Sequence, residues 1–482
     1  MTENNPTNTP SLAHFMDRRN FMRTSVLTGA GVYLATSKGA VAQAESGEKG
    51  LTAAIVGCGA QGQRLFLASN ELTGIKLVAA CDIWSYNRRI VAARIKAKYG
   101  SCNEYETIEE LLAKETNLDC VIIATPDFLH APYTRLALQA GKAVYCEKMM
   151  SNTIEAAADM VKAQRETGGI LQIGHQRQSN PRYINLRDNV LNGNKLLGRV
   201  THCYGQWNRG VASSAPLTSK FPVEPAILAK HGYASMEEFL NWRYFKKYGG
   251  GPIADLGAHQ IGMFNWFFKT TPVSVIATGG VDYFDGTANT DGTMKPKFEL
   301  PDNVQAIYEF KTPEGITRAY YQVLTTTGSQ GYFEKLMGVD GSAVISEQAS
   351  INQVYKEPNS TKNWNDFANG DNPVLARSRD AVYHKVWEKP KPWTRPDSWM
   401  DVPKTDSRVS KGLETWELGA TMAGAFHAPH LDNFFKAARK KDPSILTCPV
   451  DDAFRTCVTV LKCYESMASG AKYVFKPEDF IV

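Results

Sequence analysis

The sequence predicts an α/β chain with two folded parts, a parallel sheet wrapped by helices and then a mostly antiparallel sheet that carries helices. In the first part, short apolar runs alternate with amphipathic stretches of helical length. In the second part, runs with partial apolar–polar alternation follow one another with few helical patterns between them. The length of 482 residues and the 43% hydrophobic content suit two or three globular domains.

The first part, which we place at residues 45–175, contains five expected strands with helices between them. The strands are Leu51–Val56, Ile75–Cys81, Leu118–Ala124, Ala143–Cys146 and Ile170–Ile173. The intervening helices include Tyr86–Tyr99, Thr107–Lys114 and Ala131–Ala140. Buried strands separated by such helices are typical of βαβ units, so we expect a doubly wound parallel sheet.

The second part, residues 176–482, is expected to be an α+β domain with a large open, mostly antiparallel sheet. Its strands are expected at Val200–Trp207, Val273–Gly279, Val304–Phe310, Arg318–Leu324, Lys335–Gly338 and Ser342–Ser346. Helices are expected at Ile253–Phe268 and His430–Lys441. Residues 350–415, rich in Asn, Pro, Asp and Lys, predict a long irregular insertion.

The first 44 residues have the pattern of a twin-arginine signal peptide. Arg18-Arg19 precedes a mildly apolar stretch over residues 25–35, and Ala42-Gln43-Ala44 offers small residues for cleavage. We therefore expect the twin-arginine translocase as a partner and a periplasmic or otherwise exported protein. That route carries folded cargo, so a cofactor can be bound before export.

Composition excludes several classes of function. The net charge of +5 is spread along the sequence. It contains no basic run with interleaved aromatic residues, so nucleic-acid binding is not expected. The sequence contains no apolar stretch of about 18 residues, so no membrane span is expected. The nine cysteines are odd in number and lack paired spacing, so no disulfide framework is expected.

A glycine-rich turn directly follows the first strand and opens a helical pattern, in the order Gly57-Cys58-Gly59-Ala60-Gln61-Gly62. The first glycine permits a tight turn, the second lets the backbone approach a pyrophosphate, and the third lets helix pack on strand. The phosphates then meet the positive end of the helix. These features predict a Rossmann domain that binds a dinucleotide.

Asp82 ends the next strand, 20 residues after Gly62, where a carboxylate can accept hydrogen bonds from the adenosine ribose. The carboxylate would repel a 2′-phosphate, which favours NAD as the cofactor. Arg88 and Arg89 follow closely and leave NADP as the alternative.

Three further motifs occur in order along the chain. They are Ala124-Thr125-Pro126-Asp127-Phe128-Leu129-His130, then Cys146-Glu147-Lys148, then Gly250-Gly251-Pro252-Ile253-Ala254-Asp255-Leu256-Gly257-Ala258-His259. With the glycine turn, they make the chain resemble the Gfo/Idh/MocA oxidoreductases, the glucose-fructose oxidoreductase and inositol dehydrogenase group. The resemblance covers about residues 50–350, with a weaker similarity in the C-terminal helix.

The resemblance implies a catalytic role for Lys148, Asp255 and His259. The cofactor contacts that it implies are Thr125, Pro126, His130, Glu147 and Lys148, besides the glycine turn and Asp82. Met149 replaces the proline that usually follows the lysine, which puts the geometry of that loop in doubt.

The chemistry of the three catalytic residues agrees with that role. The imidazole of His259 titrates in the range needed to accept a hydroxyl proton. The ammonium of Lys148 could stabilise negative charge on the reacting oxygen. Asp255, four residues before His259, could hold the substrate or orient the imidazole. A solvated lysine and a helix-stabilising Asp–His pair are the alternatives.

Four further residues are candidates for substrate contact, with weaker support from the sequence. His175 and Arg177 follow the fifth strand, where a structural hydrogen-bonding role is equally open. Trp207 and Tyr244 combine aromatic rings with polar neighbours, as sugar sites do, and buried packing is their alternative. His427-x-x-His430 lacks a third ligand, so no metal is expected.

These features together favour an exported oxidoreductase that oxidises or reduces a ring hydroxyl of a sugar or glycoside with tightly bound NAD(P). An NAD-dependent glycosidase acting by transient oxidation and elimination is the first alternative, and a non-catalytic sugar-binding protein is the second. The resemblance also implies a homo-oligomer.

Overall fold

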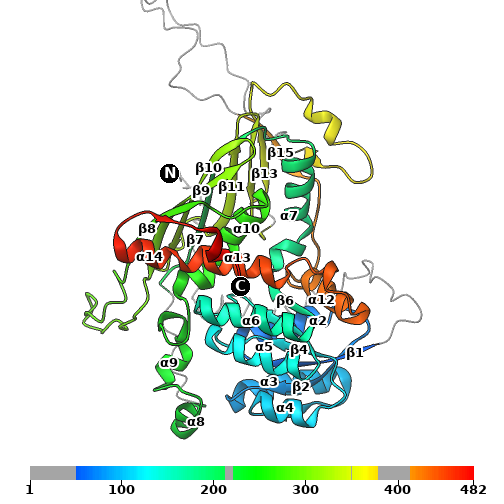
Figure 1. The fold of residues 1–482 in the computed structure, drawn as a ribbon, viewed down its shortest axis with the longest axis vertical. Helices are drawn as coiled ribbons and strands as arrows, with labels where there is room; N and C mark the ends of the chain where they lie inside the picture. The colour runs from blue at the N-terminus through cyan, green and yellow to red at the C-terminus, as the bar shows by residue number, and fades with distance from the viewer. Residues whose placement is uncertain (1–49, 212–220, 349, 378–412) are drawn as a thin grey trace, which may run out of the picture. The chain divides into compact units, whose positions relative to one another are not determined.

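The computed structural model describes residues 50–211, 221–348, 350–377 and 413–482 (Figure 1). The expected signal peptide, residues 1–44, lies outside the described residues, as does the 378–412 portion of the expected insertion. In the described ranges, no helix is long and apolar enough to cross a membrane.

The first sheet has six parallel strands in the order β3-β2-β1-β4-β5-β6. The strands are β1 Leu51–Val56, β2 Ile75–Cys81, β3 Asn103–Tyr105, β4 Cys120–Ile123, β5 Ala143–Glu147 and β6 Leu171–Gly174. This order confirms the doubly wound sheet. β3 was not expected, because two of its three residues are exposed and polar and give no apolar run.

Five helices flank these strands in sequence, and the three expected ones begin and end within one residue of their predicted bounds. They are α2 Ala60–Ser69, α3 Ser85–Tyr99, α4 Ile108–Lys114, α5 His130–Gln139 and α6 Ile154–Thr167. The side chain of Thr107 caps α4 and that of Thr153 caps α6. Gly100 and Gly168 end α3 and α6 in the left-handed conformation that glycine adopts readily.

The second sheet has ten strands in the order β14-β15-β13-β12-β11-β7-β10-β9-β8-β16, antiparallel except between β7 and β10. The six expected strands are β7 Val200–Asn208, β8 Ser274–Gly280, β9 Asn303–Thr312, β10 Gly315–Leu324, β11 Tyr332–Gly338 and β12 Gly341–Ile345. A large, mostly antiparallel sheet is therefore confirmed.

One face of this sheet is buried under helices. Along β9, alternate residues from Val304 to Phe310 are buried, as the period of two requires. They share a core with the π-helical turn η5 (Ile253–Gly257), α10 (Ala258–Phe268) and α13 (Val450–Leu461). The remaining C-terminal elements are α12 Ala428–Lys440, α14 Cys463–Ser469 and β16 Tyr473–Val474.

The described parts of the expected irregular insertion, residues 350–377 and 413–415, are not entirely irregular. Three short strands from this region extend the sheet: β13 Gln353–Lys356, β14 Leu375–Arg377 and β15 Glu414–Leu418. Trp364 and Trp416 lie beside one another there, with ring centroids 6.4 Å apart and both side chains buried. Strands of three to five residues among polar neighbours leave too little alternation to be recognised.

A buried ion network connects the end of the first sheet to the second. Arg177, just after β6, is 1% exposed and pairs with Glu334 on β11 and with Glu347 after β12. Tyr183 donates a 2.9 Å hydrogen bond to Glu334. Burial raises the pKa of Glu334 to about 7, and the charge of Arg177 opposes that rise. Arg177 is thus fully engaged inside the protein.

We expect Arg177→Met to lower the free energy of unfolding by about 3 to 5 kcal/mol, because two carboxyl groups would stay buried without a cation. Urea denaturation measures the change. Arg318→Met is the matched control, since its 3.1 Å pair with Glu309 lies on an arginine that is 56% exposed, and its effect should stay below about 1 kcal/mol. Equal effects of the two substitutions would contradict a supporting role for the network.

Candidate functional site

The glycine turn leaves backbone exposed where a dinucleotide needs it. Gly57 has φ +93°, and a Cβ there would lie 2.4 Å from the carbonyl oxygen of Ala124. A Cβ on Gly62 would lie 1.9 Å from the carbonyl oxygen of Gly57, so the first turn of α2 can pack against the strand only without it. Nothing lies within 4 Å of the corresponding position on Gly59. This open cradle at the start of α2 fits a pyrophosphate.

Asp82 is fixed at the carboxyl end of β2 by two backbone donors. One oxygen accepts from the amide of Cys58 and the other from the amide of Trp84, both at 2.7 Å. Burial raises the pKa of Asp82, and these two hydrogen bonds and the charge of Arg88 oppose the rise. Each oxygen keeps a lone pair that a ribose hydroxyl can use.

The arginines that could have favoured NADP are not equivalent. Arg88 donates to the carbonyl oxygen of Asp82 at 2.6 Å and lies 3.4 Å from the carboxylate of Glu104. Arg89 is exposed on α3. Arg88 is thus engaged by Asp82 and Glu104, and Arg89 is the exposed member of the pair.

Gln61 and Glu147 connect the glycine turn to the end of β5. The amide nitrogen of Gln61 donates to Glu147 at 2.9 Å and lies 2.9 Å from Nε2 of His427, which precedes α12. His427 is a site residue that the sequence reasoning considered only as a metal ligand. Its neighbour His430 is instead buried against Ser179 and the carbonyl oxygen of Ile173. Within the described ranges no three potential ligands gather around a metal position.

The loop after β4 and the loop after β5 are joined by His130. Its Nδ1 lies 2.6 Å from the carbonyl oxygen of Met149, and its Nε2 lies 2.9 Å from that of Thr125. Burial lowers the pKa of His130 to about 4, so the ring is neutral. It contacts backbone and supports the site indirectly. Pro126 begins the short turn after β4, and the buried hydroxyl of Thr125 has no partner among the described residues.

Lys148 and Asp255 form an ion pair between the two halves of the chain. The ammonium of Lys148 donates to the backbone oxygen of Asp255 at 2.5 Å and to its carboxylate at 3.2 Å. Arg243 contacts the other carboxylate oxygen at 3.0 Å. Burial alone would raise the pKa of Asp255, but the charges of Arg243, Lys148 and Arg209 hold it well below its usual range. The carboxylate is therefore ionised.

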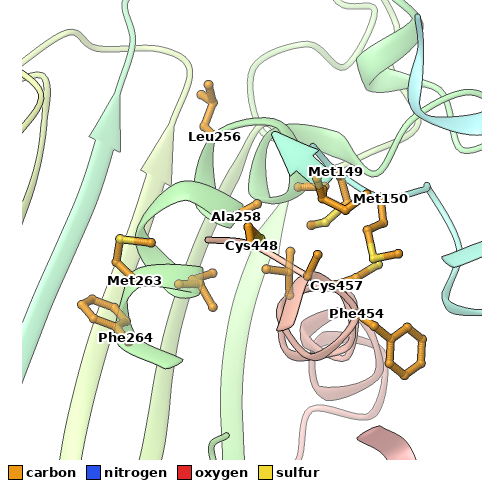
Figure 2. Packing of buried hydrophobic residues seen from close by; sticks show 14 of the residues in the cluster. Met149, Met150, Leu256, Ala258, Met263, Phe264, Cys448, Phe454 and Cys457 are labelled. Atoms are coloured by element: carbon orange, nitrogen blue, oxygen red, sulfur yellow. The ribbon is translucent and has the colours of Figure 1, made fainter. Parts of the chain in front are cut away.

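The two methionines after Lys148 anchor its loop in the core. Met149, where the family usually has proline, and Met150 are fully buried and belong to the same cluster as Cys457 of α13 (Figure 2). The Lys148–Met149 peptide bond is cis. Hydrophobic packing therefore holds this loop, and Lys148 leaves it toward Asp255.

His259 and His175 are buried, neutral imidazoles in the same site. His259 is 8% exposed, and its Nδ1 has no partner among the described residues. Burial, then the charges of Lys148 and Arg177, lowers the pKa of His259 well below its usual value. Burial, then the charge of Lys148, lowers the pKa of His175 to about 3. Neither of its ring nitrogens has a hydrogen-bond partner among the described residues. Both rings are therefore neutral and have a nitrogen that can accept a hydrogen bond.

Asp127 is a carboxyl group in this cluster to which the sequence reasoning gave no role, although it lies within a quoted motif. It is 3% exposed, and one oxygen accepts from the amide of Gly250 at 3.4 Å. Burial raises its pKa to about 7; Lys148 opposes this rise and the charge of Asp255 adds to it. Near neutral pH it holds a proton part of the time.

The two aromatic candidates lie close to the cluster. Trp207 is half-buried, stacked on Tyr332 at 4.3 Å, with its centroid 5.3 Å from that of His259. Tyr244 stacks on Phe298 at 4.2 Å, and burial and the charge of Asp255 raise its phenol pKa. The structure thus brings Trp207 to the catalytic candidates, and the substrate contacts themselves stay predictions.

Comparison with known families matches both halves of the chain. Residues 51–175 match the family described as "Oxidoreductase family, NAD-binding Rossmann fold". Residues 226–342 match the GFO/IDH/MocA C-terminal domain.

Individual relatives are distant. A 2,7-anhydro-N-acetylneuraminate hydratase of Mediterraneibacter gnavus is 23% identical over 57% of this chain and 65% of its own length, so the alignment spans less than two thirds of that relative. An inositol 2-dehydrogenase of Rhizobium meliloti is 25% identical over 63% of this chain and 80% of its own. A 1,5-anhydro-D-fructose reductase of Ensifer adhaerens is 25% identical over 49% and 60%.

Solved structures share the fold. A levoglucosan dehydrogenase in complex with NADH and L-sorbose superposes with a TM-score of 0.61 at 17% identity, covering 88% of this chain and 99% of its own. The two family matches, the open glycine cradle and the fixed Asp82 carboxylate identify NAD(H) as the cofactor of the first domain. The chain belongs to the Gfo/Idh/MocA oxidoreductase family.

Proposed function

We propose that this chain is an NAD-dependent oxidoreductase that oxidises or reduces a ring hydroxyl of a sugar or glycoside. The observation that supports this most is the Lys148–Asp255 ion pair beside the neutral imidazole of His259. Both groups lie at the carboxyl edge of the NAD-binding sheet, where open α/β sheets bind their ligands. Bound NAD would supply the hydride acceptor.

The residues of the chain can perform the remaining chemistry. The hydrogen of the carbinol C–H bond leaves as hydride, and the proton of the hydroxyl on the same carbon passes to a ring nitrogen of His259. That nitrogen can take the proton because the imidazole is uncharged in the resting site. Two hydrogen bonds to Asp255 orient the ammonium of Lys148, whose third proton can point at the reacting oxygen. Negative charge on that oxygen is then stabilised in a largely buried site.

A carbohydrate is the substrate class that fits best. Two of the relatives are named for inositol and for 1,5-anhydro-D-fructose. Trp207 presents a half-buried aromatic surface beside His259, and the apolar face of a sugar ring packs well on such a surface.

Export through residues 1–44 would make retention of the cofactor necessary, since released NADH is scarce outside the cytoplasm. We expect replacement of Arg18 and Arg19 together by lysine to leave the protein in the cytoplasm of its host, as measured by cell fractionation and immunoblotting. Unchanged export of this variant would contradict the proposed signal.

An NAD-dependent glycosidase is the second candidate, because one relative in the same family is named as a hydratase. Transient oxidation of a ring hydroxyl acidifies the neighbouring C–H, and elimination then breaks the glycosidic bond. Lys148, Asp255 and His259 would serve the oxidation step in both reactions.

The test begins with mass spectrometry of the nucleotide that copurifies, followed by mixing the protein with sugars and glycosides while recording absorbance of the reduced nicotinamide. Stoichiometric NAD and reduction by a sugar are expected. Release of phenol from aryl glycosides without net NADH would favour the glycosidase. A protein without affinity for NAD would overturn both reactions.

We expect Lys148→Met to reduce kcat/KM by about 10²- to 10⁴-fold, because the reacting oxygen loses its charged donor. Steady-state kinetics measure this, and fluorescence of bound NADH shows whether the variant still holds cofactor. Lys162→Met, an exposed position on α6, is the control and should leave both unchanged. Intact turnover in Lys148→Met would support the sugar-binding alternative.

Asp127 gives a pH-dependence with a defined sign. Its folded-state pKa of about 7 exceeds the unfolded value near 4, so between these values the folded chain keeps a proton that the unfolded chain has lost. The free energy of unfolding therefore falls as pH rises from about 4 to 7, by on the order of 4 kcal/mol. Asp127→Asn removes this fall, so its stability relative to wild type should rise across that window and stay constant above it.

Urea denaturation at several pH values measures the difference between Asp127→Asn and wild type. Asp371→Asn, at an exposed position, is the control and should track wild type throughout. A difference that does not change with pH would contradict the assigned ionisation.

A further inference from the structure

A segment from the second half of the chain packs against the first sheet. We define the strap as residues 221–248, which contain α8 (Pro225–Lys230), α9 (Met236–Leu240) and the turn η4 (Trp242–Tyr244). It lies in sequence between β7 and η5, and Figure 1 shows α8 and α9 projecting beyond the ten-stranded sheet. Its contacts with the first domain fall on the loops after β2, β3 and β4 and, through hydrogen bonds from Asn152 to the backbone oxygens of Lys246 and Lys247, on the loop after β5.

The loop after β2 makes the first contact. Trp84 donates from its indole nitrogen to the backbone oxygen of Phe221 at 2.8 Å. The ring of Phe221 stacks on Tyr86 with centroids 4.9 Å apart, and Trp84 meets Phe239 edge-on at 5.8 Å. Because the amide of Trp84 also holds the carboxylate of Asp82, the strap attaches directly beside the ribose-binding residue.

The loop after β4 makes the second contact. The amide of Phe128 donates to the backbone oxygen of Tyr248 at 3.2 Å. The ring of Phe128 packs edge-on against the rings of Tyr233 and Tyr248, with centroid distances of 5.8 and 5.3 Å. Burial, then the charges of Tyr133 and Asp82, raises the pKa of the Tyr233 phenol.

An ionic contact follows β3. Glu106 accepts from Lys230 at 2.8 Å and lies 3.5 Å from His231, and both partners belong to the strap. The loops contacted by these aromatic and ionic groups leave the carboxyl ends of β2, β3 and β4, and Asn152 adds a polar contact after β5. In a parallel sheet of the order β3-β2-β1-β4-β5-β6, the loops after β2, β3 and β4 flank the adenosine half of a bound dinucleotide.

We propose that the strap is the outer wall of the adenosine site and slows the release of NAD(H). This inference rests on the proposed function, in which one cofactor is kept through many turnovers. An NAD molecule seated between Asp82 and the glycine turn cannot leave past the strap until Phe221 separates from Tyr86 and Trp84, and Glu106 from Lys230.

The test measures release of NADH by its fluorescence after addition of excess NAD⁺, in the full-length protein. Glu106→Ala and Phe221→Ala each remove one strap contact and should speed release about fivefold, and the double variant more than tenfold. Glu110→Ala is the matched control, because that glutamate pairs with Lys114 at 2.6 Å on the neighbouring helix and does not touch the strap. Reduced nicotinamide mononucleotide, which lacks adenosine, should bind all variants equally.

Release of NADH from Glu106→Ala and Phe221→Ala at the control rate would overturn the inference. Equal weakening of NADH and of the mononucleotide would also overturn it, because it would show a general loss of structure. If Phe221→Ala does not fold, Glu106→Ala at its partly exposed surface position decides alone. Faster release from the variants in a protein that oxidises no sugar would reject the proposed function and leave the strap in place.

Discussion

The ion pair between Lys148 and Asp255 is the interaction on which the site depends, because it joins the end of β5 to the turn that begins α10. Two largely buried charges are stable together only when their remaining hydrogen-bonding capacity is satisfied. Arg243 occupies the second oxygen of Asp255, and the backbone oxygen of the same aspartate receives the lysine. The pair therefore fixes the distance between cofactor domain and substrate domain as well as the direction of the ammonium.

The positive charge around this pair explains the states of the neighbouring groups. Burial, and then the charges of Lys148 and Arg177, lower the pKa of His259 and keep its ring neutral in the resting site. Burial raises the pKa of Asp127 to about 7, so this neighbour can hold or lose a proton near neutral pH.

The parts that the sequence predicted correctly depend on local pattern. The turn at Gly57 requires a positive φ that glycine supplies, and the buried strands of the first domain are apolar runs that any reading detects. The parts it missed depend on tertiary contacts. Asp127 is one letter in a motif until Gly250 and Lys148 surround it, and His427 reaches Gln61 from 366 residues away. Short strands such as β14 form only because β15 is already beside them.

The strap follows from the same constraint that governs the ion pair, the need to keep two domains and one ligand in register. Lys148, after β5, ties the second half of the chain to the first domain at Asp255, and residues 221–248 tie it to the loops after β2 and β4 through Trp84 and Phe128. A dinucleotide bound between two such attachments adds a third, since it contacts the same loops. Cofactor and domain interface then stabilise each other, and loss of either weakens the other by the same free energy. The proposed export from the compartment where NAD is made would make this reciprocity most useful.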